Sequence, residues 1–406
     1  MQKILTWKLY HAWRFLTIVF LRFLADDRTI SANPVDKMIF MLNRINYQKE
    51  QIMVNILSPE EKLKALDATW RLEDTREVPF IIEIGTFHGA TKKFFDDAAA
   101  EVKWSEDFHR EREGVYDYGL PNIKPNQGIG IIAAAFGCEY TVNDEADPWI
   151  KPILREENAS DVQKLEIPDP QTNAVFLKTW KRIEELQSLS NMPLRAVNVP
   201  SPLVTASMIW DYTSFIECML ICPDEVHELL EKVTQATIIY IREQFRRINN
   251  LFSVSHESSC PVPRWAGVRI SDDTAALLSP NMYREFGVKY NNMISKEFGG
   301  IVVHSCGDVQ HVAPAMMETE GLKGLDFTIP QVMNWESLRD AASGKTVLCL
   351  RQRYWDHPKD SGVNLADYSE KLVNTFGRKG VIIETSTATP EEARALGEEL
   401  HRRFSR

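Results

Sequence analysis

The chain has 406 residues, of which 44% are hydrophobic and 26% charged, the composition of an ordinary globular protein. Its length accommodates one large α/β barrel of about 250 residues with additions, or two smaller domains. The net charge of −10 argues against a nucleic-acid binder with a basic surface, and six cysteines without disulfide-like spacing indicate a reducing, cytoplasmic compartment.

Residues 1–57 are predicted to form a helical extension ahead of the main domain. Residues 4–24 are rich in Leu, Phe, Ile and Trp, but their longest charge-free run, Phe15–Leu21, is too short to span a bilayer, which takes about 20 residues. Charges inside this region and the lack of a small-residue cleavage site also disfavour a signal peptide. The segment is expected to be either an amphipathic docking helix or an upstream extension ahead of a start at Met38 or Met41.

Residues 58–406 are predicted to form the main domain, which begins with a helix. Ser58 is a good N-cap for it and Glu61 completes a capping box. The run Pro79–Ile84 is apolar at nearly every position, as in a strand covered on both faces. The loop after this strand carries His88, which is either a catalytic candidate or a solvated side chain.

The middle of the chain is predicted to contain an irregular stretch and then regular elements. Residues 105–155 are loop-rich and are expected to hold insertions or a short hairpin. A helix over Ala174–Leu189, a strand over Leu194–Val199 and a long amphipathic helix over Pro223–Asn249 follow.

From Phe252 onward, short strands and helices alternate, which calls for a parallel sheet. The predicted strands are Phe252–His256, Gly267–Ile270, Ile301–His304, Gly324–Phe327, Thr346–Leu350 and Val381–Glu384. The predicted helices include Asn281–Lys296, Asp308–Thr319, Trp335–Ala342, Ala366–Phe376 and Pro390–Arg403. No Gly-x-Gly-x-x-Gly motif follows a strand, so a dinucleotide fold has no support. The number of units favours a closed (β/α)8 barrel.

The stretch Gly299–Asp308 carries the clearest chemical signal. Residues two apart on a strand point to the same face, so His304 and Cys306 are predicted to project together. An imidazole and a thiol are ligands that zinc accepts, although both residue types are also common in cores. Gly307 is expected to turn the chain, and Asp308 to cap the next helix. The site then lies where a strand passes to a helix, the face of a barrel that carries chemistry.

Several motifs resemble the uroporphyrinogen decarboxylase superfamily, over roughly residues 58–400. They are Pro200-Ser201-Pro202-Leu203 with the helix that follows, Ile270-Ser271-Asp272-Asp273, Leu278-Ser279-Pro280 through Tyr283 and Phe286, and His304-Ser305-Cys306-Gly307. The resemblance implies a (β/α)8 TIM barrel, which agrees with the count of units.

The superfamily holds two chemistries. Its decarboxylases carry an arginine-rich stretch after the first strand that clamps the acetate groups of a tetrapyrrole. The matching segment Ile84–Ala90 contains no arginine, so the forked donors that an anionic porphyrinogen needs are missing. Decarboxylation of uroporphyrinogen is therefore disfavoured.

The other branch, the cobalamin-dependent methyltransferases, carries a similar His-x-Cys-Gly motif. The resemblance implies zinc on His304 and Cys306, a thiol or other small methyl acceptor, and a corrinoid (cobalamin) carried by a partner protein. In that branch a cysteine at the end of the last strand is the third ligand, but no cysteine lies there in this chain. Glu384 is predicted to replace it, with Cys349 and Asp326 as alternatives.

Further candidates follow two other strands. Asp272 and Asp273 are either catalytic residues or helix caps, and Arg351, Arg353 and Tyr354 suit an anionic substrate or a cofactor rim. The main prediction is a zinc-dependent, corrinoid-linked methyltransferase. The alternatives are a decarboxylase or another lyase acting on a small substrate, and a non-catalytic barrel subunit.

Overall fold

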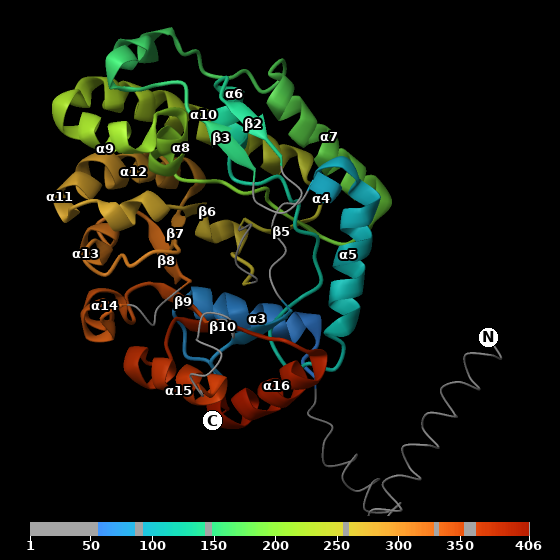
Figure 1. The fold of residues 1–406 in the computed structure, drawn as a ribbon. Coiled ribbons are helices and arrows are strands. Elements are labelled where there is room, and N and C mark those ends of the chain that lie inside the picture. The colour runs from blue at the N-terminus through green and yellow to red at the C-terminus, as the bar shows by residue number, and fades with distance from the viewer. Residues whose placement is uncertain are drawn as a thin grey trace, which may run out of the picture. The chain divides into compact units, whose positions relative to one another are not determined.

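Parallel strands alternate with helices through the main domain of the protein. The computed structural model describes residues 56–85, 92–142, 148–254, 260–328, 333–352 and 363–405. The extension predicted over residues 1–57 lies almost wholly outside the described residues, and its boundary stays a prediction. Figure 1 shows the strands at the centre of the domain with the helices outside them.

Six parallel strands form the main sheet, in the order β1-β10-β9-β8-β7-β6. Most of their side chains are buried, because one face of each strand points into the barrel and the other faces the helices. Their bounds are β1 (Phe80–Ile84), β6 (Val268–Ser271), β7 (Ile301–Ser305), β8 (Leu322–Phe327), β9 (Val347–Arg351) and β10 (Val381–Thr387).

Shorter pairings close the sheet into a barrel, which confirms the predicted fold class. The N–H of Tyr118 donates to the carbonyl of Phe80 at 2.9 Å, and Ile123 bridges to Leu194 in parallel. At the other side, the N–H of Ser201 donates to the carbonyl of Ser271 at 2.7 Å. Two short strands complete this part in a parallel pair, β4 (Leu194–Arg195) and β5 (Leu251–Ser253).

The expected hairpin in the irregular region is present. It is an antiparallel pair, β2 (Glu139–Thr141) and β3 (Trp149–Lys151). The helices in the first half of the domain are α3 (Pro59–Trp70), α4 (Lys92–Asp96), α5 (Ala98–Glu111), α6 (Ile131–Ala135), η1 (Glu156–Lys164), α7 (Ala174–Leu189), α8 (Pro202–Ile209), α9 (Tyr212–Ile221) and α10 (Pro223–Arg247).

The helices of the second half lie between its strands and after the last of them. They are η2 (Arg264–Ala266), η3 (Asp273–Leu277), α11 (Pro280–Tyr283), a π-helical turn η4 (Arg284–Val288), α12 (Lys289–Phe298), α13 (Ala313–Met316), α14 (Trp335–Ala342), α15 (Leu365–Phe376) and α16 (Pro390–Phe404). Successive outer helices pack side by side, α13 with α14, α14 with α15 and α15 with α16.

Local sequence explains where these helices begin. The Ser58 side chain accepts the N–H of Glu61, and the Glu61 carboxylate accepts the N–H of Ser58, which is the predicted capping box of α3. Thr389 and Glu392 form the same box at α16. The prediction that Asp308 caps a helix is wrong, because its side chain accepts the N–H of Gln310 in a turn and α13 begins only at Ala313.

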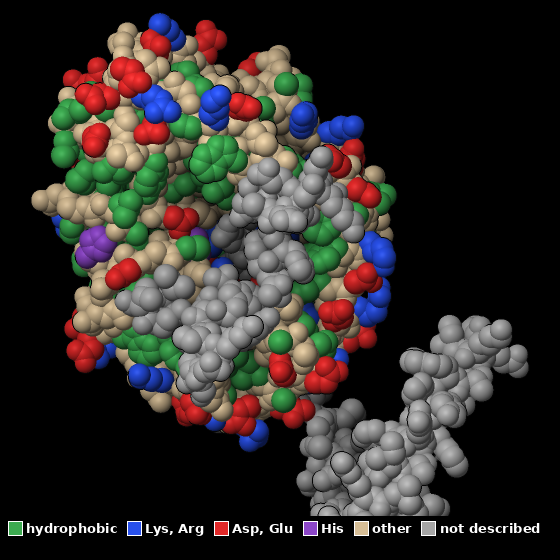
Figure 2. Space-filling model, viewed as in Figure 1, with side chains coloured by type: hydrophobic (Ala, Val, Ile, Leu, Met, Phe, Trp, Pro, Cys, Tyr) green, Lys and Arg blue, Asp and Glu red, His purple; other side chains and the backbone are tan. Residues whose placement is uncertain are grey.

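The described residues on the face shown in Figure 2 form no basic patch, as expected for an acidic chain. Figure 2 shows Lys and Arg side chains interspersed with Asp and Glu along the rim of that face. Among the described residues, no helix combines the length and the apolar composition needed to cross a bilayer.

Candidate metal centre

The side chains of His304 and Cys306 meet at the carboxyl end of β7. The Nε2 atom of His304 lies 3.1 Å from the Sγ atom of Cys306. Their spacing of two along an extended chain turns both toward the same side. His304 is fully buried and Cys306 is exposed, so the pair connects the barrel interior with solvent.

Asp273 joins this pair from the neighbouring strand. The parallel register of β6 and β7 sets Ser271 beside His304, so the residues after β6 lie next to the end of β7. The Oδ1 atom of Asp273 accepts the N–H of Cys306 at 2.6 Å. One ligand atom each from Asp273, His304 and Cys306 lies within 4.8 Å of the others.

Asp326 lies behind the imidazole of His304. The two residues are register partners on β7 and β8, and the Oδ2 atom of Asp326 is 3.3 Å from the Nδ1 atom of His304. The same oxygen accepts a hydrogen bond from Nε of Arg269 at 2.7 Å. A carboxylate at Nδ1 fixes the orientation of the ring, which leaves Nε2 directed at the cluster.

The charges of this group shift the pKa values of its members. Burial raises the pKa of Asp326, but Arg269, His304 and Arg351 outweigh it and hold that pKa below its ordinary value. Burial and the Arg269 cation lower the pKa of His304, but Asp326 and Cys306 outweigh them and raise it to about 9. An ionised carboxylate therefore faces a basic imidazole.

Glu384, the predicted third ligand, has other partners. Its Oε2 atom lies 3.2 Å from Nε of Arg351, and its Oε1 atom accepts the N–H of Cys260 at 3.4 Å. Within the described part of the chain, the metal-ligand cluster consists of Asp273, His304 and Cys306 without Glu384. The geometry thus favours Asp273 over Glu384 as the third donor.

The two alternative third ligands are also occupied. Asp326 serves His304 and Arg269, as described above. A hydrogen bond with Cys260, together with burial, raises the pKa of the Cys349 thiol well above its ordinary value. Cys349 therefore already has a partner in Cys260, and it does not belong to the cluster of ligand atoms found among the described residues.

Asp272 is buried among hydrogen-bond donors. It accepts from Ser201 Oγ and Tyr283 Oη, each at 2.7 Å, and from Asn291 Nδ2 at 3.1 Å. Its own N–H donates to the carbonyl of His304 at 2.7 Å. Burial raises the pKa of Asp272 against these hydrogen bonds. The residue therefore anchors the chain that presents Asp273, and its side chain does not reach solvent.

The other sequence candidates lie elsewhere or outside the described residues. His88, Arg353 and Tyr354 are outside the described residues. Arg351 is buried at the end of β9, where its Nη2 atom lies 3.6 Å from Asp326 Oδ2, so it belongs to the ion-pair network inside the barrel.

Sequence reasoning did not single out Arg269, which completes the network behind His304. Its side chain is buried, and both Nε and Nη2 approach Asp326, at 2.7 and 2.6 Å. An arginine inside an otherwise apolar predicted strand was the available signal, because a buried guanidinium requires an anionic partner.

The cluster offers an imidazole nitrogen, a thiol sulfur and a carboxylate oxygen, the three donor types that zinc accepts. Three protein ligands with an exposed cysteine among them match a catalytic zinc site, which keeps one position for a substrate. Asp326 supplies the outer support that such a histidine usually has. The residues present therefore fit zinc.

Comparisons with known proteins agree with the motifs. The model of the family "Uroporphyrinogen decarboxylase (URO-D)" matches residues 113–258. The chain is 24% identical over 218 residues to a uroporphyrinogen decarboxylase of Xylella fastidiosa, covering 50% of this chain and 55% of the relative. It is 25% identical over 228 residues to that of Xanthomonas axonopodis pv. citri, covering 52% and 56%. The alignments thus span about half the length of these curated relatives.

A solved structure is similar over more of the chain. A methyltransferase from Methanosarcina mazei superposes with a TM-score of 0.59 at 15% identity, covering 85% of this chain and 99% of that one. At a sequence identity this low, the match establishes a shared fold and does not establish a shared activity. Together, the family match and the curated relatives show that part of the chain is similar to uroporphyrinogen decarboxylases, and the structural match shows a shared fold.

Proposed function

We propose that the protein is a zinc-dependent methyltransferase that moves a methyl group between a corrinoid protein and a small thiol or similar acceptor. The observation that carries this proposal is the cluster of Asp273, His304 and Cys306 at the carboxyl ends of two adjacent barrel strands. Chemistry in this fold takes place at that end of the barrel.

Each residue of the cluster has a definite task in this proposal. His304 Nε2, Cys306 Sγ and a carboxylate oxygen of Asp273 hold the zinc ion. Asp326 keeps the His304 ring oriented, and Asp272 anchors the segment that carries Asp273. Because Cys306 is exposed, an acceptor reaches the cluster from solvent.

Bound zinc lowers the pKa of a thiol, so that the nucleophilic thiolate is present at neutral pH. The chain's own contribution is to direct the ligands and to leave one side of the cluster open. In the proposed transfer, the bond between the methyl carbon and the acceptor sulfur would form as the bond between that carbon and the corrinoid breaks, and the electron pair of the broken bond would stay with the corrinoid. The thiol proton of the acceptor would be released to solvent when the thiolate forms.

The names of the curated relatives favour a second candidate, a decarboxylase or another lyase acting on a small substrate. Buried arginines inside the barrel are compatible with an anionic substrate, but Arg269 is paired with Asp326 and Arg351 contacts Glu384. Since Ile84–Ala90 contains no arginine, uroporphyrinogen itself is not the expected substrate. A barrel that serves as a non-catalytic subunit is the third candidate.

The experiment combines metal analysis with a transfer assay. Full-length protein purified without chelator should contain close to one zinc per chain by mass spectrometry. It should also accelerate methyl transfer from methylcobalamin to a small thiol, followed by the cobalamin absorbance. Cys306→Ser should lose zinc and transfer together, because a hydroxyl is a far poorer zinc ligand than a thiolate. Cys222→Ser, which changes a cysteine between α9 and α10 and outside the cluster, is the matched control.

Two outcomes separate the candidates. Wild type that neither contains nor binds zinc on titration excludes the methyltransferase proposal in this form. Formation of coproporphyrinogen from uroporphyrinogen by the purified protein would instead establish the decarboxylase and overturn the reasoning from the missing arginines.

A further inference from the structure

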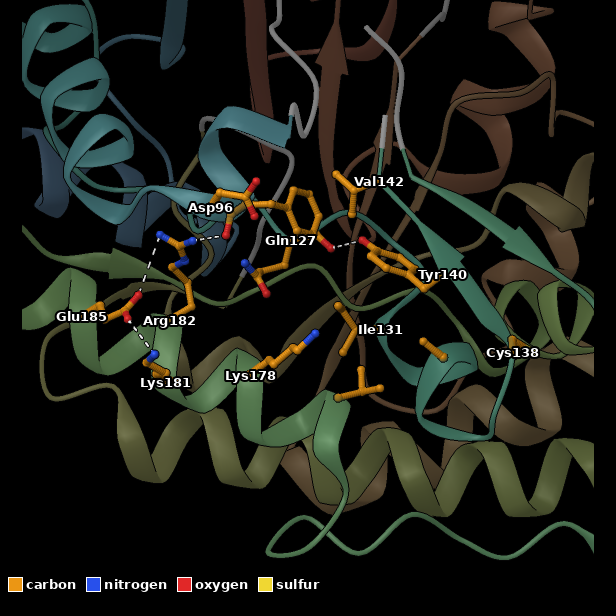
Figure 3. A pocket seen from close by; sticks show the side chains of 13 residues that line it. Asp96, Gln127, Ile131, Cys138, Tyr140, Val142, Lys178, Lys181, Arg182 and Glu185 are labelled. Carbon is orange, nitrogen blue, oxygen red and sulfur yellow. Dashed lines mark hydrogen bonds and ion pairs between the residues drawn. The ribbon is translucent and has the colours of Figure 1, made fainter. Parts of the chain in front are cut away.

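A cavity in the first half of the main domain has a lining that shares no residue with the metal cluster. It has a volume of about 580 Å³ and is enclosed by α4, α6, β2 and α7 (Figure 3). This volume is within the range of small-molecule sites, about 300–1,000 Å³. None of Asp273, His304 and Cys306 lines it. The cavity is therefore distinct from the candidate metal centre.

One wall of the cavity is cationic. Lys178, Lys181 and Arg182 line it from α7, and their spacing of three and four residues sets them on one face of that helix. Glu185 lies 3.6 Å from Lys181 and 3.9 Å from Arg182, which neutralises part of this charge. Lys178 has no hydrogen bond or ion pair with any described residue, and Figure 3 shows its amine directed into the cavity.

Gln127 adds a neutral hydrogen-bonding group beside this amine. The residue is only 5% exposed, and its side-chain amide lines the cavity without a hydrogen-bond partner in the described chain. Its backbone carbonyl accepts a hydrogen bond from Tyr140 Oη at 2.5 Å, which holds this part of the loop in place. Because the amide opens onto the cavity, its N–H groups can donate hydrogen bonds to a ligand there.

Apart from the carboxylate of Asp96, the remaining walls are mainly apolar or aromatic. The rings of Phe95 and Tyr140 lie 6.0 Å apart, centroid to centroid, on one side. Ile131, Ala134 and Val175 also line the cavity. A cavity that combines apolar walls with one cationic end suits a ligand built in the same way.

We propose that this cavity binds a small organic anion with a planar apolar body. The anionic group, a carboxylate, sulfonate or phosphate, takes the Lys178 amine and the Gln127 amide as donors. The apolar body lies between the aromatic pair and the aliphatic wall. Lys178 is the main determinant because the other two cations on α7 share Glu185.

The test uses the full chain and isothermal titration calorimetry with four ligands that share one ring system. The anionic probes are 2-naphthoate, naphthalene-2-sulfonate and 2-naphthyl phosphate, and 2-naphthol is the neutral probe. At least one anion should bind saturably with one site per chain, and 2-naphthol should bind about tenfold more weakly or not at all. Which anion binds most tightly identifies the headgroup.

Variants locate the site. Lys178→Gln should weaken binding of the anion by about tenfold, as expected for the loss of a charged hydrogen-bond donor. Lys178→Arg should retain most of the affinity. Lys296→Gln removes the same charge from an exposed position on α12 and should leave binding unchanged. Val175→Trp should abolish binding by filling the cavity, while circular dichroism reports whether each variant is folded.

Binding at this cavity does not depend on the metal centre. Cys306→Ser should therefore bind the anion with wild-type affinity, with zinc present or removed. The proposal is overturned if no anionic probe binds, if 2-naphthol binds as tightly as the anions, or if folded Lys178→Gln keeps wild-type affinity. Anion binding that disappears in Cys306→Ser would place the ligand at the metal cluster and would likewise overturn the proposal.

Discussion

Asp273 and Glu384 are both carboxylates near the top of the barrel, but their partners differ. Asp273 accepts a hydrogen bond from the backbone N–H of Cys306, whereas Glu384 faces the guanidinium of Arg351. A carboxylate that already neutralises a buried cation is less free to bind a metal, because leaving that cation alone is costly. Asp273 becomes the third ligand because it follows β6, the strand next to β7, whereas Glu384 belongs to β10.

We expect Asp273→Asn to weaken zinc binding by about tenfold or more, since a neutral amide replaces a charged oxygen donor. Glu384→Gln should leave zinc affinity within about threefold of wild type. Instead it should destabilise the barrel, because Arg351 loses a partner. Competition titration against a chromophoric chelator measures both affinities. Loss of zinc in Glu384→Gln alone would restore the assignment first drawn from the sequence.

Glu101 is a buried carboxyl whose ionisation opposes folding. Burial raises its pKa to about 7, against a hydrogen bond from the Asn126 N–H and the charge of Arg182. Between its ordinary pKa of 4.5 and about 7, the folded state holds a proton that the unfolded state has released. Stability contributed by this group is therefore fully present below the lower value and lost as the pH rises through the upper one.

Glu101→Gln should remove this pH dependence. The free energy of unfolding of wild type relative to the variant should fall by about 3 kcal/mol between pH 4.5 and pH 7.5, from 1.36 kcal/mol per pKa unit. Urea unfolding at several pH values measures it. Glu106→Gln, an exposed change on the same helix, should follow wild type throughout. If the free energies of unfolding of Glu101→Gln and wild type changed with pH in the same way, the raised pKa of Glu101 would not be the cause of the pH dependence.

At the scale of elements, local sequence predicts helices better than it predicts what lies between them. The helices Ala174–Leu189 and Trp335–Ala342 have the predicted bounds because their N-caps, Asn173 and Asn334, mark the start. The helix expected from Asp308 shortens to α13, because an aspartate after a glycine serves a turn as readily as a cap.

Only part of the metal cluster can be predicted from the sequence. Pairing of His304 with Cys306 follows from strand alternation, which the sequence carries. The approach of Asp273 depends on the register between β6 and β7, and that register is set by barrel packing over residues far apart in the chain. The arginine–carboxylate network behind His304 likewise joins β6, β7, β8 and β9. The types of these residues alone do not predict which of them will be in contact.

That register depends on a close approach between β6 and β7. Gly267 has a φ of +92°, and a Cβ atom there would lie 1.8 Å from the carbonyl oxygen of Gly300. Gly267→Ala therefore adds a backbone collision to conformational strain, and we expect it to cost about 4 kcal/mol of unfolding free energy. Gly137→Ala is the matched control, because Gly137 has a φ of +103° with nothing within 4 Å of the added Cβ.

The control should cost about 1–2 kcal/mol, from strain alone. Denaturant unfolding of the two variants measures the difference. Equal losses would mean that the strands separate freely at Gly267. The predicted relation between β6, β7 and the metal cluster would then lose its structural basis.

For the whole molecule, the cluster links two strands of the barrel at its open end. Asp273 follows β6, whereas His304 and Cys306 belong to the end of β7, so a metal held by all three ties adjacent units together. The unfolded chain separates these residues by about 30 positions and has no preformed site. Zinc should therefore bind the folded state preferentially and stabilise the whole barrel.

The expected gain is about 4 kcal/mol when free zinc is 1,000 times its dissociation constant. Thermal unfolding of full-length protein, stripped with chelator and then titrated with zinc, measures it as a rise in Tm that saturates at one zinc per chain. Cys306→Ser should show no such rise at the same zinc concentrations, while Cys222→Ser should behave as wild type. If zinc stabilises Cys306→Ser as strongly as wild type, the ion binds elsewhere, and the cluster at the end of β7 is not its site.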